Sequence, residues 1–263
     1  MANSRSGDSV LERCVRVLEA FDQHHPERSI AEIAEAASLP SSTAYRLVTD
    51  MVRVGFLEKR ASGNVVIGRR AWELFNRTNP VETLRFRAHP ILEGVHTSVQ
   101  LFTSLAVPEF QDQELLFVDA FDRFGNARIH ASHAGRMKLF DNSSGIAMLA
   151  YAPRGLQEEV LRGDLISPTT GKKFSAERLR RQLEFVRRNG YIKLTDGLVE
   201  ENTAYAVPVL GPTMEVVAAI SVVGRDEEVE DRIILAVLAA AGSALTQVET
   251  ALSVPQMSAG TPS

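Results

Sequence analysis

The chain has 263 residues, of which 44% are hydrophobic and 24% charged, and its formal net charge is −4. These values are typical of a globular protein with one large or two ordinary domains, and they exclude a disordered, collagenous or membrane-embedded chain. The single cysteine, Cys14, excludes a disulfide framework and an all-cysteine metal site.

The N-terminal part of the sequence predicts three short helices. Two S-x-x-E capping boxes, at 9–12 and 29–32, mark the starts of the first two helices. Leu39-Pro40 ends the second helix, and Ser41 or Ser42 is expected to cap the third. The inward positions of the third helix recur at helical spacing: Ala44, Leu47, Val48 and Met51.

A hairpin is expected after the third helix. Gly55 stands where a left-handed residue ends such a helix. Strands at 56–60 and 64–67 follow, joined by Ala61-Ser62-Gly63. We interpret residues 1–67 as a winged helix-turn-helix domain and 68–82 as a linker helix and linker.

Residues 83–253 predict a mixed α+β domain in which helices pack on a sheet. Strands are expected near 100–107, 114–121, 128–130, 192–195, 204–210 and 216–224, and helices near 83–95, 143–151, 175–189 and 227–252. The Ser/Pro/Gly-rich tail, 254–263, is expected to be disordered. No apolar signal segment opens the chain, and the longest near-apolar run, 233–245, is too short for a bilayer. We therefore expect a cytoplasmic protein without a membrane partner.

Positive charge is concentrated around the third helix and the hairpin. Residues 40–70 carry a net charge of +4, whereas residues 80–263 carry −5. Such an island can be a nucleic-acid footprint, or it can be an ordinary solvated surface on a small helical bundle. Because helix spacing, basic residues and a basic hairpin coincide, we predict double-stranded DNA as the partner. The predicted DNA contacts are Ser29, Ser41, Ser42, Thr43, Tyr45, Arg46, Arg53, Arg60, Ser62 and Asn64.

The sequence also resembles a known family. The run LPSSTAYRLV at 39–48 and the break at Val54-Gly55-Phe56 closely resemble the N-terminal domain of IclR-type bacterial transcriptional regulators. A weaker resemblance continues in GRMKLFDNSSGIAMLAY at 135–151 and in EVVAAISVVG at 215–224. It implies a winged helix domain, a linker helix, a GAF-like effector-binding domain, assembly as dimers or tetramers, and control of catabolic genes by small metabolites.

The chain departs from the family pattern at three positions. Ser41 stands where the family usually has a basic residue, Lys138 where it has proline, and Ile146 where it has a basic residue. The first departure concerns a phosphate contact, and the other two lie at the mouth of the expected ligand pocket.

A ligand site is predicted around Ser143-Ser144-Gly145, which opens a helix. Free N–H groups and a glycine at a helix start can seat a carboxylate, so a carboxylic acid is the expected effector. The resemblance adds contacts on later strands and apolar neighbours. The predicted ligand contacts are Leu139, Ser144, Gly145, Met148, Asp196, Tyr205 and Ser221. The alternative is structural: a serine that caps the helix, and ordinary strand residues.

No cofactor, metal or catalytic residue is predicted. His130-x-x-His133 has ligand-like spacing, with His89 and His96 elsewhere, but no HExxH or CxxC motif accompanies them. The sequence has no G-x-S-x-G, P-loop or G-x-G-x-x-G motif. The rival interpretations are an enzyme and a GAF-like small-molecule sensor that does not bind DNA.

Overall fold

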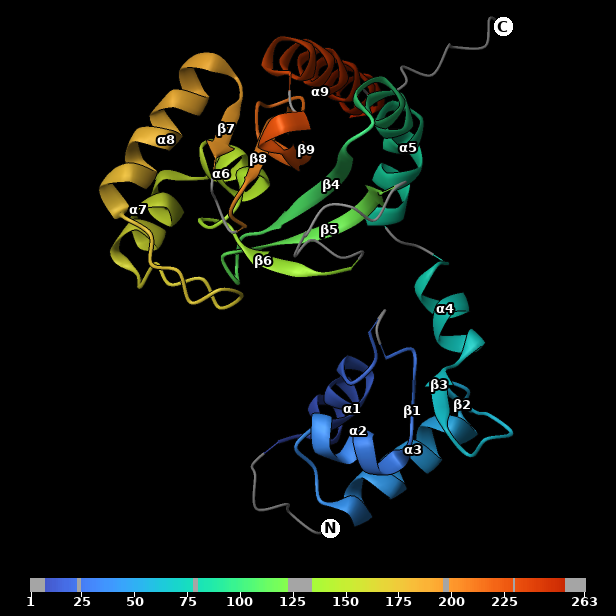
Figure 1. Cartoon of the computed structure of the whole chain (residues 1–263). Coiled ribbons are helices and arrows are strands. Elements are labelled where there is room, and N and C mark those ends of the chain that lie inside the picture. The colour runs from blue at the N-terminus through green and yellow to red at the C-terminus, as the bar shows by residue number, and fades with distance from the viewer. Residues whose placement is uncertain are drawn as a thin grey trace, which may run out of the picture. The chain divides into compact units, whose positions relative to one another are not determined.

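The computed structural model describes residues 8–22, 25–77, 80–122, 134–195, 199–228 and 230–253. The chain divides into two compact units, Met1–Asn79 and Pro80–Ser263 (Figure 1). This division falls inside the segment 68–82 that the sequence predicts as a linker. The strand expected at 128–130 and the expected tail at 254–263 lie outside the described residues.

The N-terminal unit is a helical bundle with a small sheet. Its elements are α1 (Val10–Glu19), β1 (Glu27–Arg28), α2 (Ile30–Ala36), α3 (Ser41–Arg53), β2 (Leu57–Lys59), β3 (Val65–Ile67) and α4 (Arg69–Phe75). The three strands are antiparallel in the order β1-β3-β2. The buried core joins all three helices to the sheet through Val17, Ile33, Ala44, Leu47, Val48, Met51, Leu57 and Val65. The arrangement is that of a winged helix-turn-helix, in which β2 and β3 form the wing.

Local hydrogen bonds define the helix starts. Both predicted capping boxes are present, at Ser9 with Glu12 and at Ser29 with Glu32. The prediction for α3 was wrong, because its N-cap is Pro40 and no side chain caps it. Ser41 is already the first helical residue. Its hydroxyl and that of Ser42 therefore do not cap the helix.

Two glycines allow the chain to turn sharply around the wing. Gly55 has φ +82° directly after α3, the left-handed conformation that the sequence predicts. Gly68, between β3 and α4, lies so close to this turn that an added Cβ would be 2.2 Å from the Gly55 carbonyl oxygen. The start of α4 is thereby fixed against the start of the wing.

The second unit is built on a six-stranded antiparallel sheet in the order β6-β5-β4-β9-β8-β7 (Figure 1). Its strands are β4 (Phe102–Glu109), β5 (Glu114–Phe121), β6 (Arg136–Lys138), β7 (Ile192–Thr195), β8 (Asn202–Leu210) and β9 (Val216–Arg225). Its helices are α5 (Pro80–Val99), α6 (Ser143–Leu149), α7 (Arg154–Arg162), α8 (Ala176–Asn189) and α9 (Asp231–Ser253), with the short 3-10 turn η1 (Asp226–Glu228). The sequence missed β1, β6 and α7.

Each face of this sheet has its own hydrophobic core. Helices α6, α7 and α8 cover one face, which we call the α6 face, and α5 and α9 cover the other, the α9 face. By length and composition alone, α9 could cross a membrane. In the fold, however, it buries Ile234, Leu238, Ala241 and Leu245 against the sheet. A core helix of this kind accounts for its apolar character.

Candidate DNA interface and effector face

Helix α3 presents a polar face opposite its buried one. Tyr45 is 62% exposed, and Arg46 next to it is also exposed. Within the described part of the chain, the Arg46 guanidinium makes no hydrogen bond or ion pair. Arg53 is exposed as well and pairs with Asp50 at 3.2 Å. One uncommitted guanidinium beside an exposed aromatic ring on a rigid helix can reach base edges or phosphates.

The other predicted DNA contacts differ in their exposure and in whether their side chains already make hydrogen bonds. Ser41 and Ser42 are exposed at the start of α3, and Thr43 is half-buried. The Ser29 hydroxyl is engaged, since it donates to Glu32 Oε2 at 2.7 Å and accepts from the Glu32 N–H. In the wing, Arg60 is exposed. The side chains of Ser62 and Asn64 both donate to Glu27.

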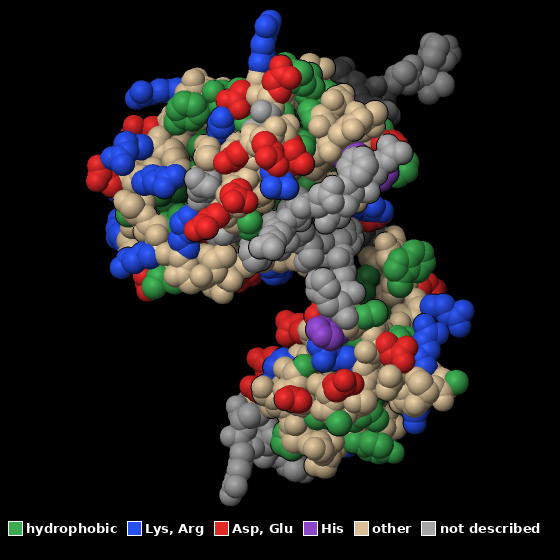
Figure 2. Space-filling view, in the orientation of Figure 1, with side chains coloured by type: hydrophobic (Ala, Val, Ile, Leu, Met, Phe, Trp, Pro, Cys, Tyr) green, Lys and Arg blue, Asp and Glu red, His purple; other side chains and the backbone are tan. Residues whose placement is uncertain are grey.

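The wing is tied to α4 by one carboxylate. Glu58 on β2 accepts hydrogen bonds from the backbone N–H of Arg69, at 2.9 Å, and from its side chain, at 3.4 Å. The backbone hydrogen bond is the main reason that the pKa of Glu58 lies below its usual value. Basic side chains gather on the flank of this unit that carries α4 and the wing (Figure 2).

The α6 face of the second unit contains a buried pair of hydroxyls. Ser104 on β4 and Ser221 on β9 are directly opposite each other, and their Oγ atoms are 2.7 Å apart. Both side chains are buried among small residues of the same face, Ala106, Ala206 and Ala219. The sequence predicted Ser221 but missed Ser104. The only sequence signal for Ser104 is its position two residues before Ala106 in a strand, which places both side chains on the same face.

At the start of α6, where the sequence predicts a carboxylate-binding site, a side chain of the protein itself accepts the hydrogen bond. The N-cap of α6 is Asn142, whose Oδ1 accepts the Gly145 N–H at 2.8 Å. An added Cβ at Gly145 would lie 2.4 Å from the Leu139 carbonyl oxygen. Gly145 is therefore required by contact with the protein's own backbone. The expectation that it leaves room for a ligand is not supported by this geometry.

A buried carboxyl group that the sequence did not single out lies beside this helix start. Asp141 is fully buried, and its Oδ2 accepts a hydrogen bond from the Ser167 hydroxyl at 2.8 Å. Its Oδ1 accepts from Asn142 Nδ2 at 3.1 Å. Burial raises the pKa of Asp141 above its usual value. Two charged carboxylates side by side at the start of α6 would be unfavourable.

The remaining predicted ligand contacts do not form one surface. Leu139 and Met148 are fully buried, and Ser144 is 2% exposed, so these three residues present almost no surface to solvent. Tyr205 lies on the α9 face, on the opposite side of the sheet from Ser221. Asp196 lies outside the described residues.

Tyr205 has a structural environment of its own. Its hydroxyl donates to the Asp231 carboxylate at the start of α9, and Lys193 Nζ donates to both oxygens of the same carboxylate at 2.7 and 2.8 Å. Burial, and then the hydrogen bond to Asp231, raise the pKa of Tyr205. The cluster joins β7, β8 and α9.

The described histidines do not form a metal site. His89 Nδ1 lies 2.8 Å from Asp119 Oδ2, and His96 Nδ1 lies 2.9 Å from the Leu101 carbonyl oxygen. No group of three metal-ligating side chains occurs among the described residues. His130 and His133 are outside this set.

Comparison with known proteins agrees with both units. The model of the IclR helix-turn-helix domain matches residues 10–61, and that of the bacterial transcriptional regulator IclR C-terminal domain matches residues 81–252. The chain belongs to the IclR family. It is a DNA-binding transcriptional regulator of this family, with the helix-turn-helix domain in the first unit.

Individual IclR-family relatives resemble the chain over most of its length. The HTH-type transcriptional regulator KipR of Bacillus subtilis is 23% identical over 80% of this chain and 84% of its own. The transcriptional repressor IclR of Escherichia coli is 26% identical over 69% and 67%. Among solved structures, an IclR homolog from Microbacterium hydrocarbonoxydans, complexed with 4-hydroxybenzoate, is 35% identical, covers 91% of this chain and 98% of its own, and has a TM-score of 0.81.

Proposed function

We propose that α3 enters the major groove of an operator and that the wing lies over the adjacent backbone. The observation that carries this proposal is Arg46, which is exposed opposite the buried face of α3 and has no partner among the described residues. A guanidinium in this position can bond bidentately to a guanine or bind a phosphate. The start of α3 would supply N–H groups and the Ser41, Ser42 and Thr43 hydroxyls to phosphates. Residues 1–67 would then be the DNA-binding domain, which we call the reading head, and 68–82 the linker helix and linker.

The test is the substitution Arg46→Ala, with Arg180→Ala on α8 as a charge-matched control. Operator sequences are first selected from a random duplex library with the wild-type protein. Arg46→Ala should then lose about 1–3 kcal/mol on the selected duplex if Arg46 contacts a base, and much less on unselected DNA. Wild-type affinity of Arg46→Ala for the selected duplex would refute the role of α3.

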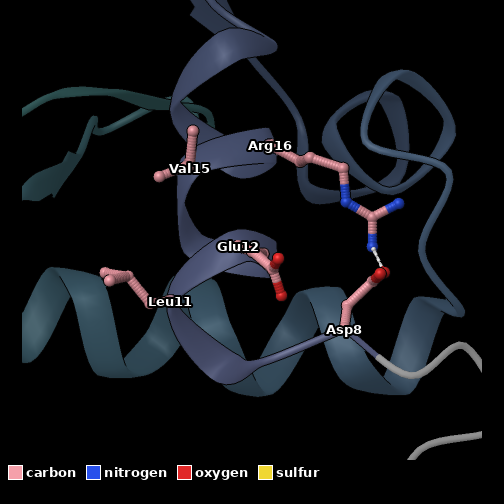
Figure 3. Close-up of a pocket in the computed structure, with 5 residues that line it drawn as sticks. All are labelled: Asp8, Leu11, Glu12, Val15 and Arg16. Atoms are coloured by element: carbon pink, nitrogen blue, oxygen red, sulfur yellow. Dashed lines mark hydrogen bonds and ion pairs between the residues drawn. The ribbon is translucent and has the colours of Figure 1, made fainter.

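The protein is proposed to act as a homodimer or tetramer, because a single reading head covers only one half-site. Two exposed apolar surfaces of the first unit support self-association. On α1, Leu11 and Val15 line a hollow beside the Asp8–Arg16 ion pair (Figure 3). On α4, Trp72 is 70% exposed, and apolar side chains appear on the surface over this helix (Figure 2). Exposed apolar patches of this kind mark interaction sites.

For the effector, we propose a small organic acid with an apolar body, such as an aromatic ring, that controls catabolic genes through the second unit. The solved relative in complex with 4-hydroxybenzoate supports this class of ligand. In this chain the Ser104–Ser221 pair offers hydroxyls within an apolar face. Since the surrounding side chains are closed over it, binding requires the α6 face to open. The proposed effector site does not include the start of α6 or Tyr205.

A thermal-shift screen of aromatic and aliphatic acids, starting with 4-hydroxybenzoate, tests the effector proposal. A ligand of the native state raises the melting temperature, and the variant Ser221→Ala should reduce that rise. A ligand whose shift is the same in Ser221→Ala would refute this location. We propose a regulator acting in the cytoplasm and no catalytic activity, in keeping with the regulators to which the chain is similar.

A further inference from the structure

The wing of the first unit is held by a carboxylate from a distant part of the sequence. Glu27 on β1 pairs with Val66 on β3, which brings its side chain to the tip of the wing. Glu27 Oε1 accepts a hydrogen bond from Asn64 Nδ2 at 2.9 Å and another from the Ser62 hydroxyl at 3.1 Å. One oxygen atom therefore accepts from both the Asn64 amide and the Ser62 hydroxyl.

The charge of this carboxylate is not neutralised by a neighbouring cation. In the part of the chain that the structure describes, Glu27 takes part in no ion pair, and its two partners are an amide and a hydroxyl. The cations of the wing, Lys59 and Arg60, are exposed and have no ion-pair partner among the same residues. The wing thus presents positive charge with one negative charge at its tip.

We propose that Glu27 restrains the wing and lowers the affinity of the protein for DNA that lacks its operator. The inference rests on the proposed position of the wing over the DNA backbone. For the Ser62 hydroxyl to donate to a phosphate, its bond to Glu27 must break, and any phosphate contact of Ser62 or Asn64 brings the Glu27 carboxylate close to the DNA. Contacts from the wing alone do not offset this cost, whereas an operator that also engages α3 does. Glu27 is in this sense a specificity-determining residue that does not bind the DNA.

Two substitutions separate the charge from the hydrogen bonds. Glu27→Gln removes the charge and keeps an oxygen acceptor, and Glu27→Ala removes both. Glu19→Gln, on the exposed surface of α1, makes the same charge change away from the wing. Fluorescence anisotropy with a labelled mixed-sequence duplex of about 30 base pairs measures non-specific affinity at several salt concentrations.

For each wing that contacts DNA, Glu27→Gln should tighten binding to the mixed-sequence duplex about two- to threefold at low salt, as expected for one charge about 8 Å from a phosphate across water. The gain should fade as salt is raised, because the interaction is screened. Glu27→Ala should gain at least as much, and Glu19→Gln should match the wild type. On a selected operator the gain should be smaller, so that the ratio of specific to non-specific affinity falls.

Unchanged or weaker binding of Glu27→Gln to the mixed-sequence duplex would overturn the proposal. An equal gain in Glu19→Gln would overturn it too, since the effect would then be one of net charge. Arg46→Ala, measured alongside, distinguishes this failure from that of the DNA interface. If Arg46→Ala weakens binding and Glu27→Gln is neutral, only the role of Glu27 is wrong. If both are neutral, the interface itself is misplaced.

Discussion

The substitution Gly145→Ala tests why the start of α6 needs a glycine. An alanine Cβ would lie 2.4 Å from the Leu139 carbonyl oxygen and 2.7 Å from its carbonyl carbon and Cα. These are backbone atoms of a segment fixed by the buried Asp141–Ser167 hydrogen bond, so they cannot move aside as a flexible side chain would. Overpacking costs about 1–3 kcal/mol, and a contact this short with backbone atoms belongs at the upper end of that range, above the at most about 1 kcal/mol that alanine regains through helix propensity.

Differential scanning calorimetry of the full chain measures the outcome. For a unit of this size, each kcal/mol corresponds to about 2–4 °C, so Gly145→Ala should lower the melting temperature of the second unit by several degrees. Gly155→Ala on α7 is the matched control, because its Cβ would have no neighbour within 4 Å. It should leave stability unchanged or raise it by up to about 1 kcal/mol.

The reasoning is refuted if Gly145→Ala is as stable as the wild type. If such a stable variant also failed to bind the effector, the glycine would be serving the ligand, as the sequence had suggested. A loss of stability that is equal in Gly145→Ala and Gly155→Ala would show that the close contact with Leu139 is not the cause.

Two further outcomes follow from particular side chains. Trp72→Glu should weaken self-association about tenfold or more, because a large exposed aromatic ring is a typical interface anchor. Sedimentation over a concentration series measures this, with Met214→Glu, a change at another exposed side chain, as the control. A monomeric wild type would contradict the prediction. The raised pKa of Asp141 means that its buried carboxylate opposes folding at neutral pH, and this penalty disappears as the pH falls through the folded-state pKa toward the ordinary value of 3.8. The wild type should therefore gain stability relative to Asp141→Asn when the pH is lowered from neutral over this range; a difference in unfolding free energy that does not vary with pH would contradict the assignment.

Features that depend only on neighbouring residues could be predicted from the amino-acid pattern. The capping boxes at Ser9 and Ser29 join groups three residues apart, so the pattern predicts the contact directly. The left-handed turn at Gly55 is likewise a local property of the backbone. Helical spacing in α3 separated the buried face from the exposed one, which we propose faces the DNA.

The assembly of the two sheets depends on contacts between distant segments and is visible only in the folded structure. Strands β1 and β6, of two and three residues, are too short to show a period, and they exist because longer strands pair with them. Ser104 and Ser221 are 117 positions apart, and nothing local links them. Tyr205 and Ser221 are on adjacent strands, but strand register and the side of the sheet separate them, because successive side chains along a strand point to opposite faces. The glycine at 145 could be read from the sequence as room for a ligand, and only the position of the Leu139 backbone shows what fills that space.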